Sequence, residues 1–204
     1  MMRFVLAAVA AASLGAPVAA SATIVNIDAS KSGCDFVHCS GEHVGPGTVL
    51  NAVFSPSQLT LAAGTYTVTN GSGKTGANPN DTAWNYNSGG NNWLWAFMAI
   101  ADDSYTVLLD SVPDPGISVV STQAAAAAQP AATNYMGSFT LSHATTVDFV
   151  TEDYYAPDNL GGVSLSVVSA TPGVPEPASW AMMLVGLGLG GAAIRSSRKR
   201  LVPA

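Results

Sequence analysis

The feature that most constrains this chain is an uncharged run of 17 residues, 178–194, near its C-terminal end. A membrane-spanning helix needs about 20 apolar residues, with a range of roughly 17–25, so the run suffices at the short limit. Four basic residues follow it: Arg195, Arg198, Lys199 and Arg200. Because positive residues stay on the cytoplasmic side of a membrane, we expect 195–204 to be a cytoplasmic tail and the preceding chain to face outward.

The other end, 1–22, has the parts of a secretory signal peptide in the right order. Arg3 follows two methionines, an apolar stretch runs from 4 to 14, and Ala20-Ser21-Ala22 offers a small-x-small site. This order predicts a short signal helix that is cleaved after Ala22, and a buried core helix is the alternative. Export through the inner membrane would then leave 23–170 as the body outside.

A proline-rich linker, 171–177, joins the body to the apolar run. It contains Pro175, Glu176 and Pro177, and Trp180 and Ala181 follow within the run. Proline cannot join a regular ladder and favours extended backbone, which suits a segment that a protease must bind. A plain membrane anchor behind an incidental proline linker is the alternative.

In its order of parts this segment resembles the PEP-CTERM sorting signal, in the PEPxxWA variety. Pro-Glu-Pro comes first, then Ser-Trp-Ala, a glycine-rich apolar stretch and a basic end. The resemblance implies a membrane transpeptidase of the exosortase type as partner, which cuts near Pro-Glu-Pro. It also implies that the protein is transiently anchored in the membrane and then reaches the cell surface or the exopolysaccharide matrix of a biofilm-forming host.

Charge is distributed unevenly between the ends and the body. From 23 to 173 the chain carries 12 acidic and 2 basic side chains, Lys31 and Lys74, which is a net charge of −10. A nucleic-acid binder needs clustered Lys and Arg, so this balance excludes nucleic acid as a partner. An acidic exported surface instead favours cations.

The body is predicted to be all-β. Short runs rich in β-branched and aromatic residues alternate with turn residues, which is typical of a β-sandwich or jelly roll of nine or ten strands. The run 93–101 is apolar throughout and predicts a central strand buried on both faces. The expected strands are 23–27, 48–54, 58–61, 64–69, 93–101, 105–110, 117–120, 135–141, 145–151 and 163–168.

Two stretches are predicted to be connections. The segment 70–92 is full of Gly, Asn and Ser, and its length favours a functional role. Trp84 and Tyr86 flank its polar part and are candidates to stack on a sugar ring of a polysaccharide. The alanine-rich segment 124–132 contains Pro130, and we expect a mobile connection there, with one or two helical turns as the alternative.

The two cysteines, Cys34 and Cys39, lie five residues apart. In an exported protein such a pair predicts a local disulfide. The alternative is a zinc site that also uses His38 and His43, which export to an oxidising space disfavours.

Carboxylate and amide side chains gather in 152–159. Asp153, Asp158 and Asn159 offer hard oxygen ligands, of which Ca²⁺ takes roughly six to eight. Gly161 and Gly162 follow and allow the chain to turn back. The segment therefore predicts a calcium site, and an ordinary acidic turn in water is the alternative.

The same segment, with its strand, Asp, short loop, polar pair and final strand, resembles the last hairpin of calcium-dependent galactose-binding bacterial lectins of jelly-roll fold. Asp153 would take the place of the first ligand, and Asp158 and Asn159 that of the amide pair. The loop is shorter here by about two residues, and the sugar-binding residues of that family cannot be placed in 70–92. The resemblance extends loosely over 50–168 and implies the fold more than the sugar.

Known catalytic motifs are absent from the sequence, including the Gly-x-Ser-x-Gly elbow, HExxH and the P-loop. We therefore expect an exported, non-catalytic binding module for calcium and carbohydrate. A structural or adhesive matrix protein without a defined ligand is the second hypothesis, and a secreted hydrolase is the third.

Overall fold

The computed structural model describes residues 21–35, 44–112, 118–170 and 186–187. The predicted signal peptide, the processing linker, most of the apolar run and the basic tail lie outside these residues. No helix among the described residues is long and apolar enough to cross a membrane. The membrane-spanning prediction for 178–194 falls almost wholly outside them, apart from Gly186 and Leu187, which are helical.

The described body is all-β with one α-helix, which confirms the predicted class. Its elements, in chain order, are β1 (Thr23–Asp28), β2 (Gly33–Cys34), β3 (Val53–Phe54), β4 (Ser57–Leu61), β5 (Gly64–Asn70), β6 (Thr82–Asn85), β7 (Trp93–Leu94), β8 (Met98–Ala101), β9 (Thr106–Asp110), α1 (Gln123–Ala132), β10 (Gly137–Leu141), β11 (Thr145–Val150), the 3₁₀ turn η1 (Ala156–Asp158) and β12 (Leu160–Ser169).

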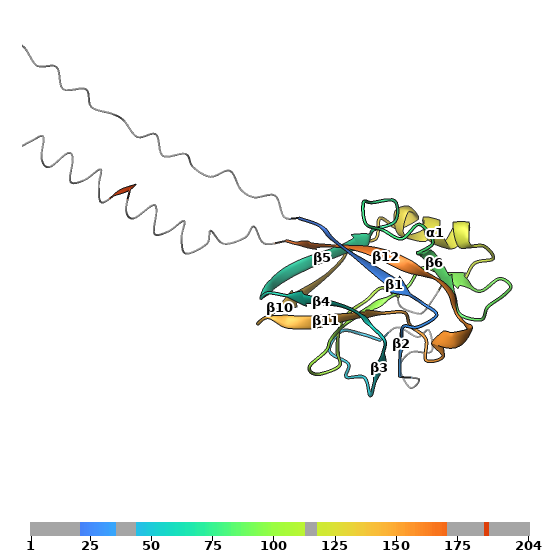
Figure 1. The fold of residues 1–204 in the computed structure, drawn as a ribbon, viewed down its shortest axis with the longest axis horizontal. Coiled ribbons are helices and arrows are strands. Elements are labelled where there is room, and N and C mark those ends of the chain that lie inside the picture. Colours follow the sequence, from blue (N-terminus) through green and yellow to red (C-terminus); the bar gives the residue numbers. More distant parts are fainter. Residues whose placement is uncertain (1–20, 36–43, 113–117, 171–185, 188–204) are drawn as a thin grey trace, which may run out of the picture. The chain divides into compact units, whose positions relative to one another are not determined.

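Two antiparallel sheets form a β-sandwich (Figure 1). One has the order β10-β5-β12-β6-β7, with β1 paired to the other side of β12. The second has the order β4-β11-β8-β9, and β2 and β3 form a separate two-stranded ribbon. The sandwich is therefore observed, whereas the narrower jelly-roll assignment stays a prediction.

The long strand β12 organises the larger sheet. Its two halves pair with β6 and β5 in turn. Ser164 donates its N–H to the Asp81 carbonyl and accepts the N–H of Gly71, so both partners lie along the same side of β12. Residues 71–81 loop out between them. This pairing explains why a strand exists at β6, inside the stretch that we expected to be a connection.

Apolar side chains from both sheets fill the main core. A second, smaller cluster is formed by Cys34, Val44, Leu50, Met98, Ile100, Val107 and Val150. Alternate residues of the period-2 strands point inward, as in β5 and β10, where Tyr66, Val68, Phe139 and Leu141 are buried. Tyr66 and Phe139 face each other across these strands with ring centroids 5.7 Å apart. The alternation seen in the sequence therefore reports the buried face correctly.

The apolar run 93–101 is not one central strand, which corrects the prediction. It contributes β7 to one sheet and β8 to the other, and Trp95–Phe97 cross between them. Every residue from Leu94 to Ala101 is buried. Crossing the core buries a segment as completely as a central strand does, and hydropathy alone does not distinguish the two.

Three other expected strands also differ. In 48–54 only β3 forms a strand, although Val49 makes an isolated bridge to Thr106. Of the expected strand 117–120 the structure describes 118–120, and there only Val120 is paired, in a bridge to Trp93. The expected strand 135–141 is shorter, because β10 begins at Gly137.

The alanine-rich segment forms the ten-residue helix α1 instead of a mobile connection. Alanine has the highest helix propensity, and the Thr122 hydroxyl caps the first turn by accepting the N–H of Ala125 at 3.2 Å. Pro130 lies in the last turn, with Ala126 on the buried side. The helix packs against β6, β7 and part of β5 (Figure 1).

Candidate functional site

The candidate site is the acidic loop, which we define as residues 151–159 between β11 and β12. Its base is bonded to the segment around β2. The Thr151 hydroxyl donates to the Ser32 carbonyl at 2.6 Å, and the Cys34 N–H donates to the Asp153 carbonyl at 2.9 Å. The loop is therefore fixed by residues more than a hundred positions away in the chain.

Asp153, Asp158 and Asn159 lie near one another in the acidic loop. The Asn159 side chain lowers the pKa of the Asp153 carboxyl and the Asp158 carboxylate raises it, so both lie close enough to act on Asp153. The Asp153 carboxylate also accepts the N–H of Tyr155 at 3.0 Å. Two carboxylates and one amide thus share a single turn.

Two oxygen atoms in this turn lack hydrogen-bond donors. Asn159 is only 2 % exposed, and its amide nitrogen donates to the Ala29 carbonyl at 3.2 Å. Its Oδ1 atom and the Oδ1 atom of Asp158 are both buried without a partner. Because a buried acceptor without a donor is costly, such atoms call for a ligand, a water molecule or an ion.

Burial raises the pKa of the Asp153 carboxyl, and the neighbouring Asp158 carboxylate adds to this shift. The hydrogen bonds from Tyr155 and Asn159 oppose it. A cation bound between the two carboxylates would favour their ionised forms, and carboxylate and amide oxygens are ligands that a hard cation such as Ca²⁺ takes. Within the described segments, no group of three or more His, Cys, Asp or Glu side chains is placed to hold a metal ion. Further oxygens would have to complete the coordination here.

The two glycines after the loop serve a different purpose from the turn that we expected. Gly161 and Gly162 lie inside β12, between β6 and β1. A Cβ atom on Gly161 would lie 2.5 Å from the Ala83 carbonyl oxygen, and one on Gly162 would lie 2.1 Å from that of Ile27. Gly161 also has a φ of 80°. Close backbone approach therefore requires glycine at both positions.

Trp84 is not available for stacking on a sugar, which corrects the prediction. It lies on β6 and is 1 % exposed. Its indole N–H donates to the Ala96 carbonyl at 2.9 Å, so the side chain is a satisfied core residue. The sequence placed Trp84 in a polar loop because β6 is surrounded by Gly and Asn.

Tyr86, in contrast, lies at the surface beside the acidic loop. It is 38 % exposed and follows Asn85, which pairs with Leu160 at the start of β12. The Ser88 hydroxyl donates to the Asp158 carbonyl, which joins the segment after β6 to the loop. The two regions that the sequence singled out separately therefore form one surface.

Two exposed tyrosines were missed as candidates. Tyr154 and Tyr155 are 51 % and 54 % exposed, and their ring centroids are 6.4 Å apart. Aromatic rings left in water on a loop fixed at its base are available to a ligand. Their position directly after Asp153 was the signal in the sequence, since two adjacent aromatic residues in an acidic loop have no core face to fill.

Glu152 points away from this surface into the interior. It is 3 % exposed, and neither of its carboxyl oxygens meets a hydrogen-bond donor. Its neighbour is the carboxyl group of Asp110, which accepts the N–H groups of Val44 and Val112. Burial raises the pKa of Glu152 well above its ordinary value, and the Asp110 carboxylate raises it further. Both effects favour the protonated form of Glu152 beside Asp110.

The remaining predicted residues divide into two groups. Cys34 is buried and disulfide-bonded. Cys39 is the only other cysteine of the sequence and lies outside the described residues. The sorting residues Pro175, Glu176, Pro177, Trp180 and Ala181 and the basic residues Arg195, Arg198, Lys199 and Arg200 also lie outside them.

The C-terminal segment places the chain among proteins that carry a C-terminal sorting signal. Residues 173–199 match the family described as the PEP-CTERM protein-sorting motif. The chain therefore carries a PEP-CTERM sorting motif, which supports export and exosortase-dependent sorting to the cell surface or the extracellular space. No curated protein and no solved structure matches the chain. The likeness of the body to lectins remains a resemblance.

Proposed function

We propose that the body is a non-catalytic binding module that holds Ca²⁺ at the acidic loop and binds carbohydrate on the surface beside it. The observation that carries the proposal is the turn that joins Asp153, Asp158 and Asn159, with two buried oxygens that lack donors. A net charge of −10 over 23–173 favours cations at any such site.

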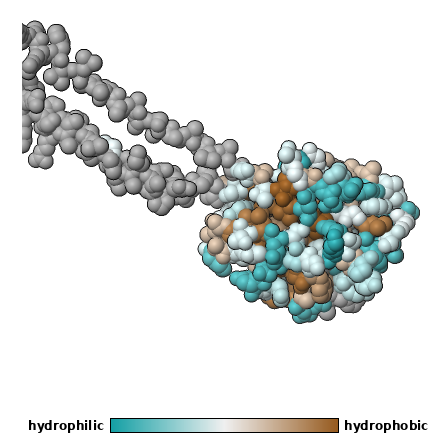
Figure 2. Space-filling view, viewed as in Figure 1, coloured by the Kyte–Doolittle hydropathy of each residue, from teal (hydrophilic) through white to brown (hydrophobic). Residues whose placement is uncertain are grey.

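The carbohydrate part of the proposal rests on the tyrosines around the loop. Tyr86, Tyr154 and Tyr155 are exposed, and the hydrogen bond from Ser88 to Asp158 joins the segment after Tyr86 to the loop that carries the other two. Figure 2 shows one face of the body, on which apolar patches are separate and polar side chains lie between them. A sugar presents an apolar C–H face and polar edges, which suits aromatic rings next to carboxylates and amides.

Calcium is expected to raise the melting temperature of the exported protein. Binding to the folded state alone stabilises it by about 2.7 kcal/mol when the ligand is at 100 times its Kd. For a body of this size, each kcal/mol corresponds to about 2–4 °C. Differential scanning calorimetry with CaCl₂ and with EDTA measures the shift, and Asp158→Asn should abolish most of it.

Asp103→Asn is the matched control, because it removes the same charge from an exposed site, where the Asp103 side chain is 61 % exposed. If calcium is held diffusely by the acidic surface, the two variants will lose the shift equally. An unchanged melting temperature after EDTA treatment would remove the calcium site.

Glycan binding is expected to depend on the exposed tyrosines. On a glycan array, Tyr155→Ala and Tyr86→Ala should reduce binding about tenfold each, since an aromatic stacking contact contributes about 0.5–1.5 kcal/mol beyond its buried area. Exposed Tyr105, which lies in the turn before β9, is the control and its change to Ala should leave binding unaltered. An array on which the wild-type protein binds no glycan would favour a structural role in the matrix.

A further inference from the structure

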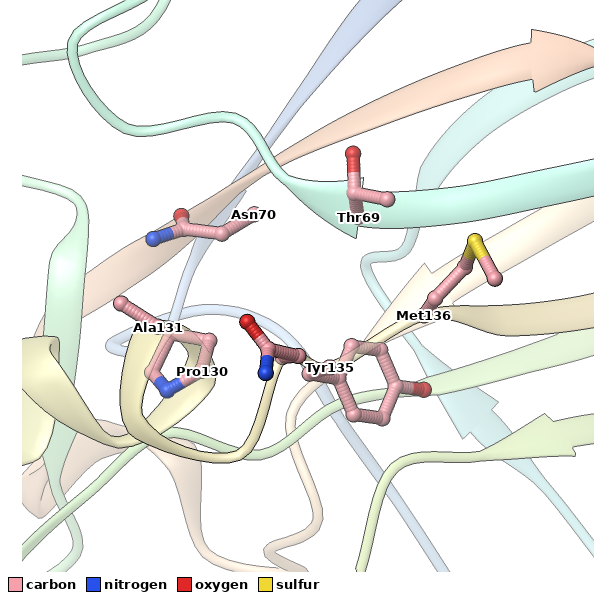
Figure 3. Close-up of a pocket in the computed structure, with 7 residues that line it drawn as sticks. Thr69, Asn70, Pro130, Ala131, Tyr135 and Met136 are labelled. Atoms are coloured by element: carbon pink, nitrogen blue, oxygen red, sulfur yellow. The ribbon is translucent and has the colours of Figure 1, made fainter.

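A pocket on the body lies between β5, the end of α1 and the segment before β10 (Figure 3). It is a shallow pocket of about 360 Å³. Small-ligand sites begin at about 300 Å³, so a single small unit fits. Its walls are Thr69 and Asn70 from β5, Pro130 and Ala131 from α1, and the connection 134–136. Neither the acidic loop nor its tyrosines contribute to it.

Polar groups and apolar surfaces face each other in this pocket. The Asn70 side-chain oxygen accepts the N–H of Ser72 at 3.0 Å, which leaves the amide nitrogen for a ligand. In Figure 3 the Asn70 amide lies across from Ala131 and Pro130. On the other side Met136 is 72 % exposed, although it is a large apolar side chain. A hydrogen-bond donor, the Asn70 amide nitrogen, thus lies in the same pocket as the apolar side chains of Pro130, Ala131 and Met136.

The helix end beside the pocket does not present bare carbonyl groups. The Ala131 carbonyl accepts the N–H of Asn134 at 3.2 Å, and the Pro130 carbonyl accepts that of Tyr135 at 2.8 Å. Asn134 takes the left-handed conformation, with a φ of 47°, that closes such a helix end. A ligand would therefore meet side chains here and not unsatisfied backbone acceptors.

A lysine contacts Thr69, one of the residues that line the pocket. The Lys74 ammonium donates to the Thr69 hydroxyl at 3.5 Å. A turn holds the lysine there, because its N–H donates to the Gly71 carbonyl at 3.0 Å and its carbonyl accepts the N–H of Ala77 at 3.0 Å. The only other lysine of the body, Lys31, is paired with Asp28 at 2.5 Å.

This contrast is informative because the body carries 12 acidic side chains and only two lysines. In the described part of the chain, the ion pairs found involve Lys31 and His143, and the hydrogen bond of Lys74 goes to a hydroxyl group. An ammonium that contacts a hydroxyl in the pocket wall, and not a carboxylate, remains available to an anionic group of a ligand.

We propose that this pocket binds a hexuronate unit of an acidic polysaccharide, with the sugar carboxylate on Lys74. The Thr69 hydroxyl and the Asn70 amide would contact the ring hydroxyl groups, and Pro130 and Met136 would contact the apolar C–H face. The site does not depend on calcium and is separate from the acidic loop. The negative charge of the rest of the body is screened beyond about 8 Å at physiological salt, so it does not prevent a local contact of this kind.

The test is an affinity measurement with the full chain, in EDTA, so that no calcium site contributes. The probe is tetragalacturonate, and its fully methyl-esterified form is the uncharged match. The wild-type chain is expected to bind the acid and to bind the ester about tenfold more weakly, since one charge-assisted hydrogen bond is lost. Lys74→Gln should weaken binding of the acid to the level of the ester, and added NaCl should do the same.

Lys31→Gln is the matched control, because it removes the only other lysine of the body, and it should bind tetragalacturonate like the wild type. Melting temperatures show whether both variants fold, and Asn70→Ala provides an independent variant within the pocket. The proposal is overturned if the wild type does not bind in EDTA, if both lysine variants weaken binding equally, or if the ester binds as well as the acid. A calcium shift on the same preparation reports on the acidic loop separately.

Discussion

Protein carrying Glu176→Ala is expected to lose most of its processed, released form in a host that has an exosortase. Glu176 lies between Pro175 and Pro177 and is the only acidic residue of the sorting motif. Prolines on either side favour an extended backbone that presents the glutamate to a binding groove. Removing its carboxylate leaves that conformation and takes away the charge that the enzyme can recognise.

The measurement is immunoblotting of cell, membrane and medium fractions, in which processing also reduces the size of the chain. Deletion of 174–204 should abolish membrane retention and sorting together, whereas Glu176→Ala should block only the processing step. Asp103→Asn removes an acidic residue from the body and serves as the control. In a host without the exosortase all full-length variants should be distributed alike. Equal distribution in the host that has the enzyme would remove the sorting claim.

The parts of the fold that the sequence predicted are those with a local signal. In β5 and β10, apolar and polar residues alternate, and the structure buries the apolar face of each. In β12 the intervening Ser164 and Ser166 are buried as well, so the alternation there does not mark an exposed face. Period 2 is set by the geometry of a single strand, so no knowledge of partners is needed. The sorting motif could also be identified from the sequence alone, because it is defined by the order of its parts along the chain.

The parts that the sequence could not show depend on distant partners. Thr82–Asn85 form a strand because β12 extends through Gly161 and Gly162 and offers a second set of backbone groups. Trp84 is buried for the same reason. No residue in the polar stretch 70–92 indicates that it will pair with β12, which begins 75 residues after β6 ends. The acidic loop was predicted as a group, but its contact with the segment after Tyr86 arises only from this pairing.

Glu152 is a single residue whose environment also depends on a partner that is distant in the sequence. In the sequence it is one of several acidic residues of 152–159 and is indistinguishable from its neighbour Asp153. In the structure it is 3 % exposed and lies against Asp110, which is 9 % exposed. Two buried carboxyl groups are stable together only while they share a proton, because two adjacent charges in the interior repel and are poorly solvated. This arrangement makes the stability of the body depend on pH.

Glu152→Gln is expected to stabilise the body above about pH 5 and to reduce the loss of stability with rising pH. Glu152 has a folded-state pKa well above its ordinary value of 4.5. A raised pKa means that the folded state binds the proton more tightly than the unfolded state. Its contribution to stability is therefore complete below the ordinary value and is lost as the pH rises towards the folded-state pKa. Within that window the loss has a slope of about 1.4 kcal/mol per pH unit.

Urea unfolding at a series of pH values measures this slope. A glutamine keeps the shape of the side chain and donates its N–H to the Asp110 carboxylate at every pH, so the variant should lack the slope that Glu152 causes. Asp103→Asn, which changes an exposed carboxylate away from this pair, is the control and should retain the wild-type dependence. Equal slopes for the wild type and Glu152→Gln would show that the carboxyl pair does not hold a shared proton. The calcium shift should survive in Glu152→Gln, since this side chain faces the core while Asp153 faces the loop.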